Sequence, residues 1–238
     1  MYTQSFDIYD TIYQLEKDYS IEAEKIDYLL QQLPANPTTI LDVACGSGEH
    51  AHHLYNKFKY SVDGIDIEPG FVEIAQKKNP SGVFIQGDMS NFDIGRKYDV
   101  VLCLFSSIGY VQTKRALCDT LTCIAKHLNS SGYLILEPWL EPTNDLSSLS
   151  TIIEAVDPKT KIQVTRKRSA YAEENISVLD IEYSIKLPKE TKQFKEQHRL
   201  GMFSREEMAE AFQQAELIFT YAEQGLHNKG IYLAKLAV

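Results

Sequence analysis

The sequence predicts an α/β fold in which helices cover both faces of a doubly wound parallel sheet, followed by a group of antiparallel strands. Three observations predict it. Helix and strand patterns alternate from Ile21 to Glu137, and a glycine-rich turn, within ILDVACGSGEH, follows the first strand pattern. From Ile152 to Leu200 the pattern changes to alternation of apolar and polar residues. Alternating helices and strands are typical of parallel sheets, whereas a period of two is typical of antiparallel strands with one covered face.

Length and composition set bounds on the number of domains and on the class of partner. A chain of 238 residues with 44% hydrophobic residues is long enough for one core with an elaboration. The net charge of -9 disfavours nucleic acid and anionic membranes as partners. The four cysteines lack C-x-x-C spacing, the first residues lack a signal-peptide pattern, and no apolar run approaches the roughly 20 residues of a membrane span. We therefore expect a cytoplasmic protein with reduced, buried thiols.

The first predicted helix and strand lead to the glycine turn. Apolar residues recur at helical spacing from Ile21 to Leu33 and stop at Pro34, which predicts a helix. The apolar run Thr39–Ala44 predicts the first strand. The glycine turn then leads into a helix from about Glu49 to Lys57.

The other elements of the parallel sheet follow at short intervals. A nearly continuous apolar run, Tyr98–Phe105, is typical of a strand that is covered on both faces. Pro69 favours a helix start, because proline fits the first helical position. The predicted elements are, in order, strand Ser61–Ile67, a helix starting at Pro69, strand Val83–Gln86, strand Tyr98–Phe105, a helix Lys114–Leu128 capped by Asn129, and strand Tyr133–Glu137.

The last third of the chain combines antiparallel strands with one helix. Ser204 and Glu207 have the spacing of a capping box, which predicts a helix through Phe212. The strand patterns Leu217–Tyr221 and Ile231–Leu236 are close enough in sequence to form a hairpin. We expect a single domain over residues 1–238, in which 1–33 form a lid and a helix, 34–137 a cofactor-binding core, 138–200 an antiparallel cap, and 201–238 a C-terminal helix and hairpin.

The glycine turn has the spacing of a nucleotide-binding motif. Gly46, Gly48 and Ala51 match G-x-G-x-x-G/A, and Asp66 follows at the distance of a ribose-binding acid. This pattern alone allows a nicotinamide enzyme. A pyrophosphate at a helix start needs bare backbone N–H groups, however. Here the carboxylates of Asp42 and Glu49 flank the turn and would repel a diphosphate.

The acidic residues favour a cationic ligand, S-adenosylmethionine, which has an amino-acid end, a sulfonium and no phosphate. Asp42 inside an apolar strand needs a partner such as an ammonium group. At the ends of the next two strands, Asp66 can accept both ribose hydroxyls, and Asp88 can accept the adenine amino group while Met89 packs on the ring. The carboxyl ends of parallel strands are where such ligands bind.

The order LDVACGSG, GIDI, QGDM, VVLCLFSSIGY and LEPW resembles class I S-adenosylmethionine-dependent methyltransferases. Within them it resembles the sugar-nucleotide N,N-dimethyltransferases of deoxyamino-sugar pathways, such as the desosamine branch. The resemblance includes the early YDTIYQ and KDY and the late HNKGIYL segments. It implies a Rossmann-like seven-stranded sheet whose last strand is antiparallel, together with a small antiparallel β cap.

The resemblance also implies roles for individual residues. Tyr19 would contact the methionine end of the cofactor, and Tyr13 and His127 would lie near the acceptor amine as the catalytic candidates. The sequence alone favours a different interpretation of His127, a surface histidine that pairs with the dipole at the C-terminus of a helix. The other implied cofactor contacts are Ala44, Ile67 and Leu104. The expected substrate contacts are Glu137 and Trp139 of LEPW, Arg168 and His198 of the cap, and Lys229, which stands where the family has an arginine.

Histidine and basic clusters have competing interpretations. We expect His50, His52 and His53 to be helix-start and surface residues and predict no metal site, because neighbours on a helix point about 100° apart. Two basic clusters in the cap are either solvated strand faces or a site for an anionic substrate. They consist of Lys159, Lys161, Arg166, Lys167 and Arg168, and of Lys189, Lys192, Lys195 and Arg199.

The sequence therefore predicts an N-methyltransferase that uses S-adenosylmethionine on the amino group of a nucleotide-linked deoxyamino sugar, with a TDP-linked sugar as the expected partner. One alternative is a methyltransferase for another small-molecule amine or hydroxyl in secondary metabolism. A nicotinamide-dependent oxidoreductase and a protein that only senses the cofactor are more remote alternatives. Apolar strands near the cap allow a homodimer, but no pattern demands one.

Overall fold

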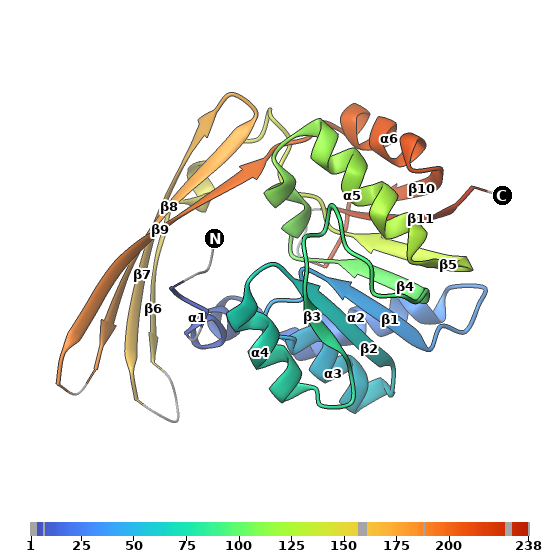
Figure 1. Cartoon of the computed structure of the whole chain (residues 1–238). Helices are drawn as coiled ribbons and strands as arrows, with labels where there is room; N and C mark the ends of the chain where they lie inside the picture. Colours follow the sequence, from blue (N-terminus) through green and yellow to red (C-terminus); the bar gives the residue numbers. More distant parts are fainter. Residues whose placement is uncertain (1–3, 7, 157–160, 188, 227–229, 238) are drawn as a thin grey trace.

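The computed structural model describes residues 4–6, 8–156, 161–187, 189–226 and 230–237. Two sheets form the body of the molecule, and helix α1 (Tyr9–Glu16) lies between them (Figure 1). The larger sheet has seven strands in the order β10-β11-β5-β4-β1-β2-β3, and the smaller has four antiparallel strands in the order β6-β7-β8-β9. This arrangement confirms the predicted fold class.

The seven-stranded sheet is parallel except at one strand. β11 runs antiparallel to both of its neighbours, β5 and β10, as the resemblance implied. The strands are β1 (Thr39–Val43), β2 (Ser61–Asp66), β3 (Phe84–Gln86), β4 (Tyr98–Cys103), β5 (Leu128–Leu136), β10 (Leu217–Ala222) and β11 (Ile231–Leu236).

Helices cover both faces of this sheet, so consecutive strand residues enter different cores. Val101 packs with α5 (Lys114–Lys126) and α6 (Arg205–Gln214) on one face. Leu102 packs on the other face, whose helices are α2 (Tyr19–Gln31), α3 (Glu49–Phe58) and α4 (Pro69–Lys78). This burial on both faces explains the continuous apolar run of β4. The described helices include none that is both long and apolar enough to cross a bilayer.

The smaller sheet packs its apolar face onto α1. Alternate residues of the central strand, such as Leu179 and Ile181, form one cluster with Tyr9, Ile12 and Tyr13 of α1. The aromatic N-terminal segment, expected to be a lid, therefore contains a helix that joins the two sheets. The strands are β6 (Thr151–Val156), β7 (Gln163–Glu173), β8 (Ile176–Lys186) and β9 (Thr191–Gly201).

Several boundaries differ from the predicted ones. α5 ends at Lys126 with His127 as its C-cap, and β5 begins at Leu128, five residues before the predicted Tyr133. Asn129 is therefore a strand residue and not a helix cap, and its amide donates to Asp99 at 2.8 Å. The predicted capping box at Ser204 and Glu207 is confirmed.

β4 ends two residues earlier than predicted because the backbone turns. Phe105 and Ser106 adopt positive φ of 52° and 61°, which is uncommon for residues other than glycine. A short 3-10 helix, η1 (Ser107–Val111), follows. Backbone strain of this kind costs of order 1–3 kcal/mol per residue and is concentrated at functional sites.

Candidate active site

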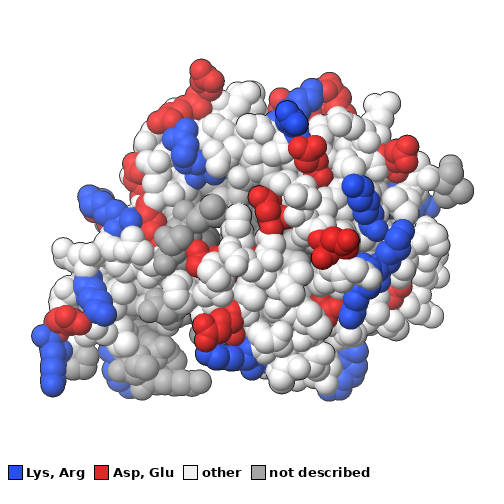
Figure 2. Space-filling model, viewed as in Figure 1, with Lys and Arg blue, Asp and Glu red and all other residues white. Residues whose placement is uncertain are grey.

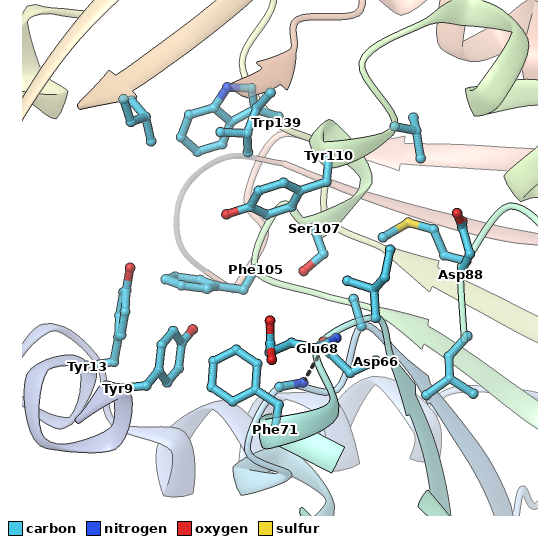
Figure 3. A pocket seen from close by; sticks show the side chains of 18 of the residues that line it. Tyr9, Tyr13, Asp66, Glu68, Phe71, Asp88, Phe105, Ser107, Tyr110 and Trp139 are labelled. Carbon is cyan, nitrogen blue, oxygen red and sulfur yellow. Dashed lines mark hydrogen bonds between the residues drawn. The ribbon is translucent and has the colours of Figure 1, made fainter. Parts of the chain in front are cut away.

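A cavity of about 470 Å³ lies at the carboxyl ends of the parallel strands, between the large sheet, α1 and the cap (Figure 3). A smaller cavity of about 50 Å³ adjoins it. Both are lined by Tyr9, Lys17, Ala44, Gly46, Phe105 and Ser107. This is the position at which α/β sheets of this kind bind their ligands.

The glycine turn leaves open space above its first glycine only. Gly46 has a φ of +54°, and a Cβ built there would meet nothing within 4 Å, so ligand atoms can approach the backbone closely. A Cβ on Gly48 would lie 2.7 Å from Asn79 Nδ2 and 3.0 Å from Ala75 Cβ. Gly46 thus lines both cavities, whereas Gly48 lines neither and instead permits close packing of α3 on α4.

Asp66 holds the turn and the start of α4 in place while facing the cavity. Its Oδ2 accepts from the Gly46 N–H at 2.8 Å, and its Oδ1 accepts from the Glu68 N–H at 2.9 Å. Burial raises the pKa of the Asp66 carboxyl, and these hydrogen bonds oppose the shift. Glu68, the N-cap of α4, adds a second carboxylate to the cavity wall. Its position before Pro69 is the sequence signal that could have found it.

Asp42 is buried in the wall of the smaller cavity without full hydrogen bonding. It is 2% exposed, and its Oδ2 has no hydrogen-bond partner. Burial and, to a smaller extent, the nearby Asp66 raise the pKa of Asp42 to about 7, while Lys17 opposes the shift. An unpartnered buried carboxylate oxygen is costly, so it marks a place where a cationic or hydrogen-bonding ligand is stabilised.

Lys17 places a buried cation in the same small cavity, and sequence reasoning missed it. Its side chain is 2% exposed, and its Nζ lies 2.9 Å from Glu22 Oε2. The ammonium also lies 4.3 Å from the centroid of the Tyr19 ring and 3.8 Å from that of Phe105. Burial lowers the pKa of Lys17, although Glu22 opposes the shift. The small cavity therefore offers a cation from Lys17 and an anion from Asp42.

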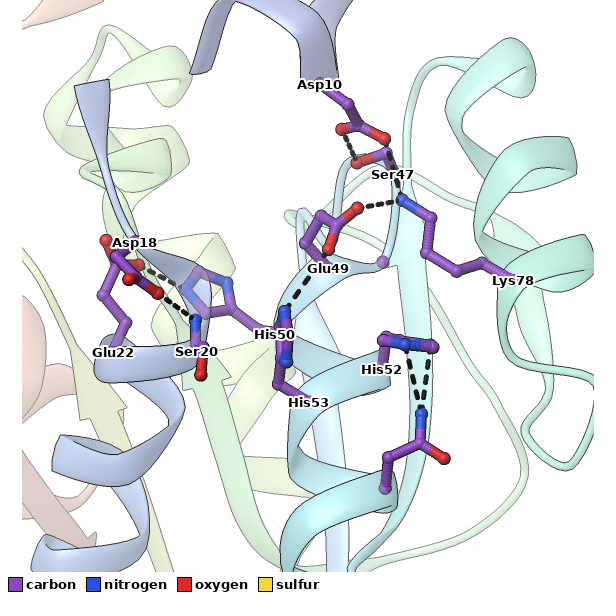
Figure 4. A network of polar contacts seen from close by, with 12 residues as sticks. Asp10, Asp18, Ser20, Glu22, Ser47, Glu49, His50, His52, His53 and Lys78 are labelled. Carbon is purple, nitrogen blue, oxygen red and sulfur yellow. Dashed lines mark hydrogen bonds and ion pairs between the residues drawn. The ribbon is translucent and has the colours of Figure 1, made fainter. Parts of the chain in front are cut away.

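His50 supports the ion pair between Lys17 and Glu22. Its Nε2 donates at 2.7 Å to Glu22 Oε2, the oxygen that pairs with Lys17 (Figure 4). Its ring makes an edge-to-face contact with the ring of Tyr19. The expectation that His50 is a surface residue is therefore wrong, because the helix turns it toward α2. His52 and His53 are partly exposed, and among the described residues no group of His, Cys, Asp and Glu side chains could hold a metal ion.

A polar network ties α1 to the glycine turn (Figure 4). Asp10 accepts from Ser47 Oγ at 2.5 Å and from Lys78 Nζ at 2.8 Å, and Lys78 also donates to Glu49 at 2.5 Å. Glu49 is thus paired with a lysine. Of the two carboxylates that were expected to attract an ammonium, only Asp42 fits that role.

The far end of the large cavity is lined by three of the expected cofactor contacts. Ile67, Asp88 and Met89 all line it, after β2 and β3. Asp88 Oδ1 also accepts from the backbone N–H and hydroxyl of Ser90, so the acid shapes its own turn as well.

Aromatic side chains from three segments line the opposite end, which faces the cap (Figure 3). Tyr13 comes from α1, Phe105 and Tyr110 from the loop after β4, and Trp139 from the segment after β5. Trp139 donates from Nε1 to Ser177 at 2.7 Å, which fixes the indole against the cap. Tyr110 and Phe105 were not predicted as site residues, because the strained turn that presents them cannot be read from an apolar run.

Four of the described residues that were predicted for the site do not line the cavities: Gly48, His127, Glu137 and His198. His127 is 5% exposed, stacks on Phe92 and donates from Nδ1 to the Cys123 carbonyl at 2.8 Å. It adjoins Tyr98, at the amino end of β4, whereas the cavity lies at the carboxyl end. We therefore withdraw His127 as a catalytic candidate, and its burial also contradicts the surface interpretation.

Glu137 and His198 lie behind the residues that line the cavity. Glu137 is buried, and its Oε2 accepts from the Phe105 N–H at 2.7 Å, so it supports the strained turn. His198 contacts the Tyr110 hydroxyl. Lys229 lies outside the described residues.

The basic residues of the cap divide between its two faces. Lys195 pairs with Glu182, and Arg199 pairs with Glu173. Arg166 is fully buried and pairs with Glu16 of α1 at 2.6 Å. Of the described members of the two clusters, Arg168 alone lines the large cavity, where its Nε donates to the Leu149 carbonyl at 2.6 Å. Most of these charges therefore belong to strand faces or internal ion pairs.

Known proteins are similar to this chain in sequence and in fold. Residues 40–132 match a family described as a methyltransferase domain. The chain is 30% identical to the dTDP-3-amino-3,4,6-trideoxy-alpha-D-glucopyranose N,N-dimethyltransferase of Streptomyces venezuelae over 95% of each protein. It is also 30% identical to the dTDP-3-amino-3,6-dideoxy-alpha-D-glucopyranose N,N-dimethyltransferase of Streptomyces fradiae, over 95% of this chain and 88% of that protein.

Solved structures agree with these relatives. The crystal structure of Streptomyces venezuelae DesVI superposes with a TM-score of 0.89 at 29% identity, covering 97% of this chain and 98% of that one. The S-adenosylmethionine-bound structure of CalS10, an amino pentose methyltransferase from Micromonospora echinaspora, gives a TM-score of 0.80 at 25% identity, covering 92% and 91%. The chain belongs to the S-adenosylmethionine-dependent methyltransferases, in the family of these amino-sugar N,N-dimethyltransferases.

Proposed function

We propose that this protein transfers methyl groups from S-adenosylmethionine to the amino group of a dTDP-linked deoxyamino sugar. The observation that carries the cofactor assignment is the small cavity. Both the buried Lys17 and Asp42, whose Oδ2 has no hydrogen-bond partner, line it. These two groups complement the carboxylate and the ammonium of an amino acid. A nicotinamide dinucleotide has neither group, and its pyrophosphate would meet the carboxylates of Asp66 and Glu68.

We place the rest of the cofactor along the large cavity, toward the ends of β2 and β3. We assign the ribose hydroxyls to Asp66 and the adenine to Asp88, Met89 and Ile67, which line consecutive parts of the wall. Tyr19 and Leu104 line the small cavity and would contact the methionine end. The carbonyl of Ala44, whose φ of 59° turns the backbone beside Gly46, belongs to the same end.

The acceptor would occupy the aromatic end of the cavity. The bound cofactor supplies a methyl group activated by its sulfonium, and the protein has to align the amine with that carbon and exclude water. Tyr13, Tyr110 and Trp139 form walls that hold a sugar ring in one orientation. Among the described residues, Lys17 and Arg168 are the cations that line the large cavity. Because Lys17 is assigned to the cofactor, we assign Arg168 to the diphosphate, and Lys229 remains a prediction for the same role.

An acceptor panel tests this function. We expect turnover with dTDP-linked amino sugars, inhibition by free dTDP, and binding of S-adenosylhomocysteine in calorimetry. Methylation of unrelated amines or hydroxyls without inhibition by dTDP would instead support the alternative of a different small-molecule acceptor. The homodimer and the cytoplasmic location expected from the sequence stay predictions.

Cofactor affinity is expected to depend on pH through Asp42. Its pKa of about 7 means that the carboxyl is largely neutral at pH 6 and ionised at pH 8. Because only the ionised form attracts the cofactor ammonium, affinity should rise by up to about tenfold per pH unit between pH 5.5 and 7. Calorimetry with S-adenosylhomocysteine measures this change.

The variant Asp42→Asn is the control for this prediction. It should bind the cofactor weakly, with no rise in affinity across the same pH range. The folded-state pKa of Asp42 exceeds its unfolded value of 3.8, so wild type loses stability as pH rises from about 4 to 7 and the variant should not. Equal pH dependence of binding in both proteins would remove Asp42 from the ammonium site.

A further inference from the structure

A chain of three side chains leads from the large cavity into the cap. The hydroxyl of Tyr110, which lines the cavity, lies 2.8 Å from Nδ1 of His198 on β9. On the other side of the imidazole, Nε2 lies 3.7 Å from Glu196 Oε2. His198 is 1% exposed and Glu196 is buried, so the chain is shielded from bulk water. Figure 3 shows that the Tyr110 hydroxyl points toward the side of the cavity to which α1 contributes Tyr13.

The charges around His198 leave it able to accept a proton. Burial lowers the pKa of His198, and Arg166 on β7 lowers it further, while Glu196 opposes the shift, so the ring is neutral at physiological pH. Burial alone would raise the pKa of Glu196, but the nearby His198 imidazole and hydrogen bonds from Ser5 and the Gln4 backbone hold it below its ordinary value. With a carboxylate beside Nε2, the ring keeps its proton there and presents Nδ1 as the acceptor.

The reaction needs such an acceptor. An amine reaches the cavity as an ammonium ion, which has no free electron pair and cannot attack carbon. A general base must remove its proton within hydrogen-bond reach of the nitrogen. Among the groups that line the aromatic end, Tyr110 is backed by a neutral imidazole and an ionised carboxylate in series.

We propose that Tyr110, His198 and Glu196 form a proton relay that deprotonates the acceptor amine. An N–H proton of the ammonium passes to the Tyr110 oxygen as the tyrosine's own proton passes to Nδ1 of His198. The imidazolium that forms is stabilised by Glu196. The freed electron pair of the amine then forms the new N–C bond as the C–S bond of the donor breaks, and the electron pair of the C–S bond stays on sulfur. After the product leaves, His198 returns the proton to water through Tyr110.

This inference rests on the proposed function, and one set of variants tests it. Tyr110→Phe removes the hydroxyl, whereas His198→Asn keeps a hydrogen-bonding group near Nδ1 but cannot take up a proton. We expect both to lower kcat at pH 7 by about 100-fold, the lower range for general-base catalysis, with little change in affinity for S-adenosylhomocysteine. Tyr171→Phe, at an exposed cap tyrosine outside the cavity lining, should retain wild-type activity.

The pH profile separates proton transfer from a structural role. Above the pKa of the acceptor ammonium the amine arrives unprotonated, so both variants should recover most of the wild-type rate there. Loss of activity by an equal factor at every pH, or full activity of His198→Asn at pH 7, would overturn the relay. A wild type that binds S-adenosylhomocysteine but methylates no amine would overturn the proposed function and the relay together. An active wild type with equally active variants would overturn the relay alone.

Discussion

Replacing Lys17 with methionine is expected to cause the largest loss of stability among single changes in the site. The substitution leaves Glu22 buried without its lysine, although His50 still donates to it. Breaking a buried ion pair from one side costs about 3–5 kcal/mol. Without the Lys17 charge, which lowers the pKa of His50, that histidine should become protonated more readily. The loss in urea unfolding experiments should therefore be smaller at pH 6 than at pH 8.

A double variant separates folding from cofactor binding. Lys17→Met with Glu22→Gln removes both charges, so most of the stability should return. Affinity for S-adenosylhomocysteine should stay low, because the carboxylate of its amino-acid end still lacks a cation. If the double variant bound the ligand as tightly as wild type, Lys17 would act on the fold alone.

The second large effect is expected for Asp66→Ala. The change removes the acceptor for the ribose hydroxyls and leaves the N–H groups of Gly46 and Glu68 without their carboxylate. Hydrogen bonds to a charged group contribute about 1.5–3 kcal/mol each, so cofactor affinity should fall by about 100-fold or more. Calorimetric titration measures this loss.

Asp66→Asn is the matched variant for this prediction. It preserves the shape of the side chain but places an NH₂ group against one of the two N–H donors. We expect an intermediate loss of affinity and a lower midpoint of thermal unfolding. An unchanged dissociation constant in either variant would contradict the assignment of the ribose to Asp66.

The sequence was a good guide to the parts of the site that regular strands position. Asp42, Asp66 and Asp88 follow from the rule that ligands bind beyond the carboxyl ends of parallel strands, and all three line a cavity. The C-terminal hairpin also agreed with expectation.

The sequence was a poor guide wherever a long-range contact decides the role. Lys17 follows a short helix, and nothing local shows that Glu22 and two aromatic rings will enclose its ammonium. Tyr110 reaches the cavity because Phe105 and Ser106 adopt positive φ and turn the backbone after β4. Glu137 holds this turn by accepting from the Phe105 N–H. His127 was misplaced because its role came from resemblance and not from its position in the sheet.

The ties of α1 have a consequence for turnover. Asp10 binds it to the glycine turn, Glu16 binds it to Arg166 of the cap, and Lys17 just beyond it faces the small cavity. We therefore expect a spent cofactor and a finished product to leave from beneath this one helix, so that neither exchanges without loosening contacts that frame the other. Because several of these contacts are ionic, added salt should weaken them and speed the release of the products. The same change would hold α1 less firmly over the cavity.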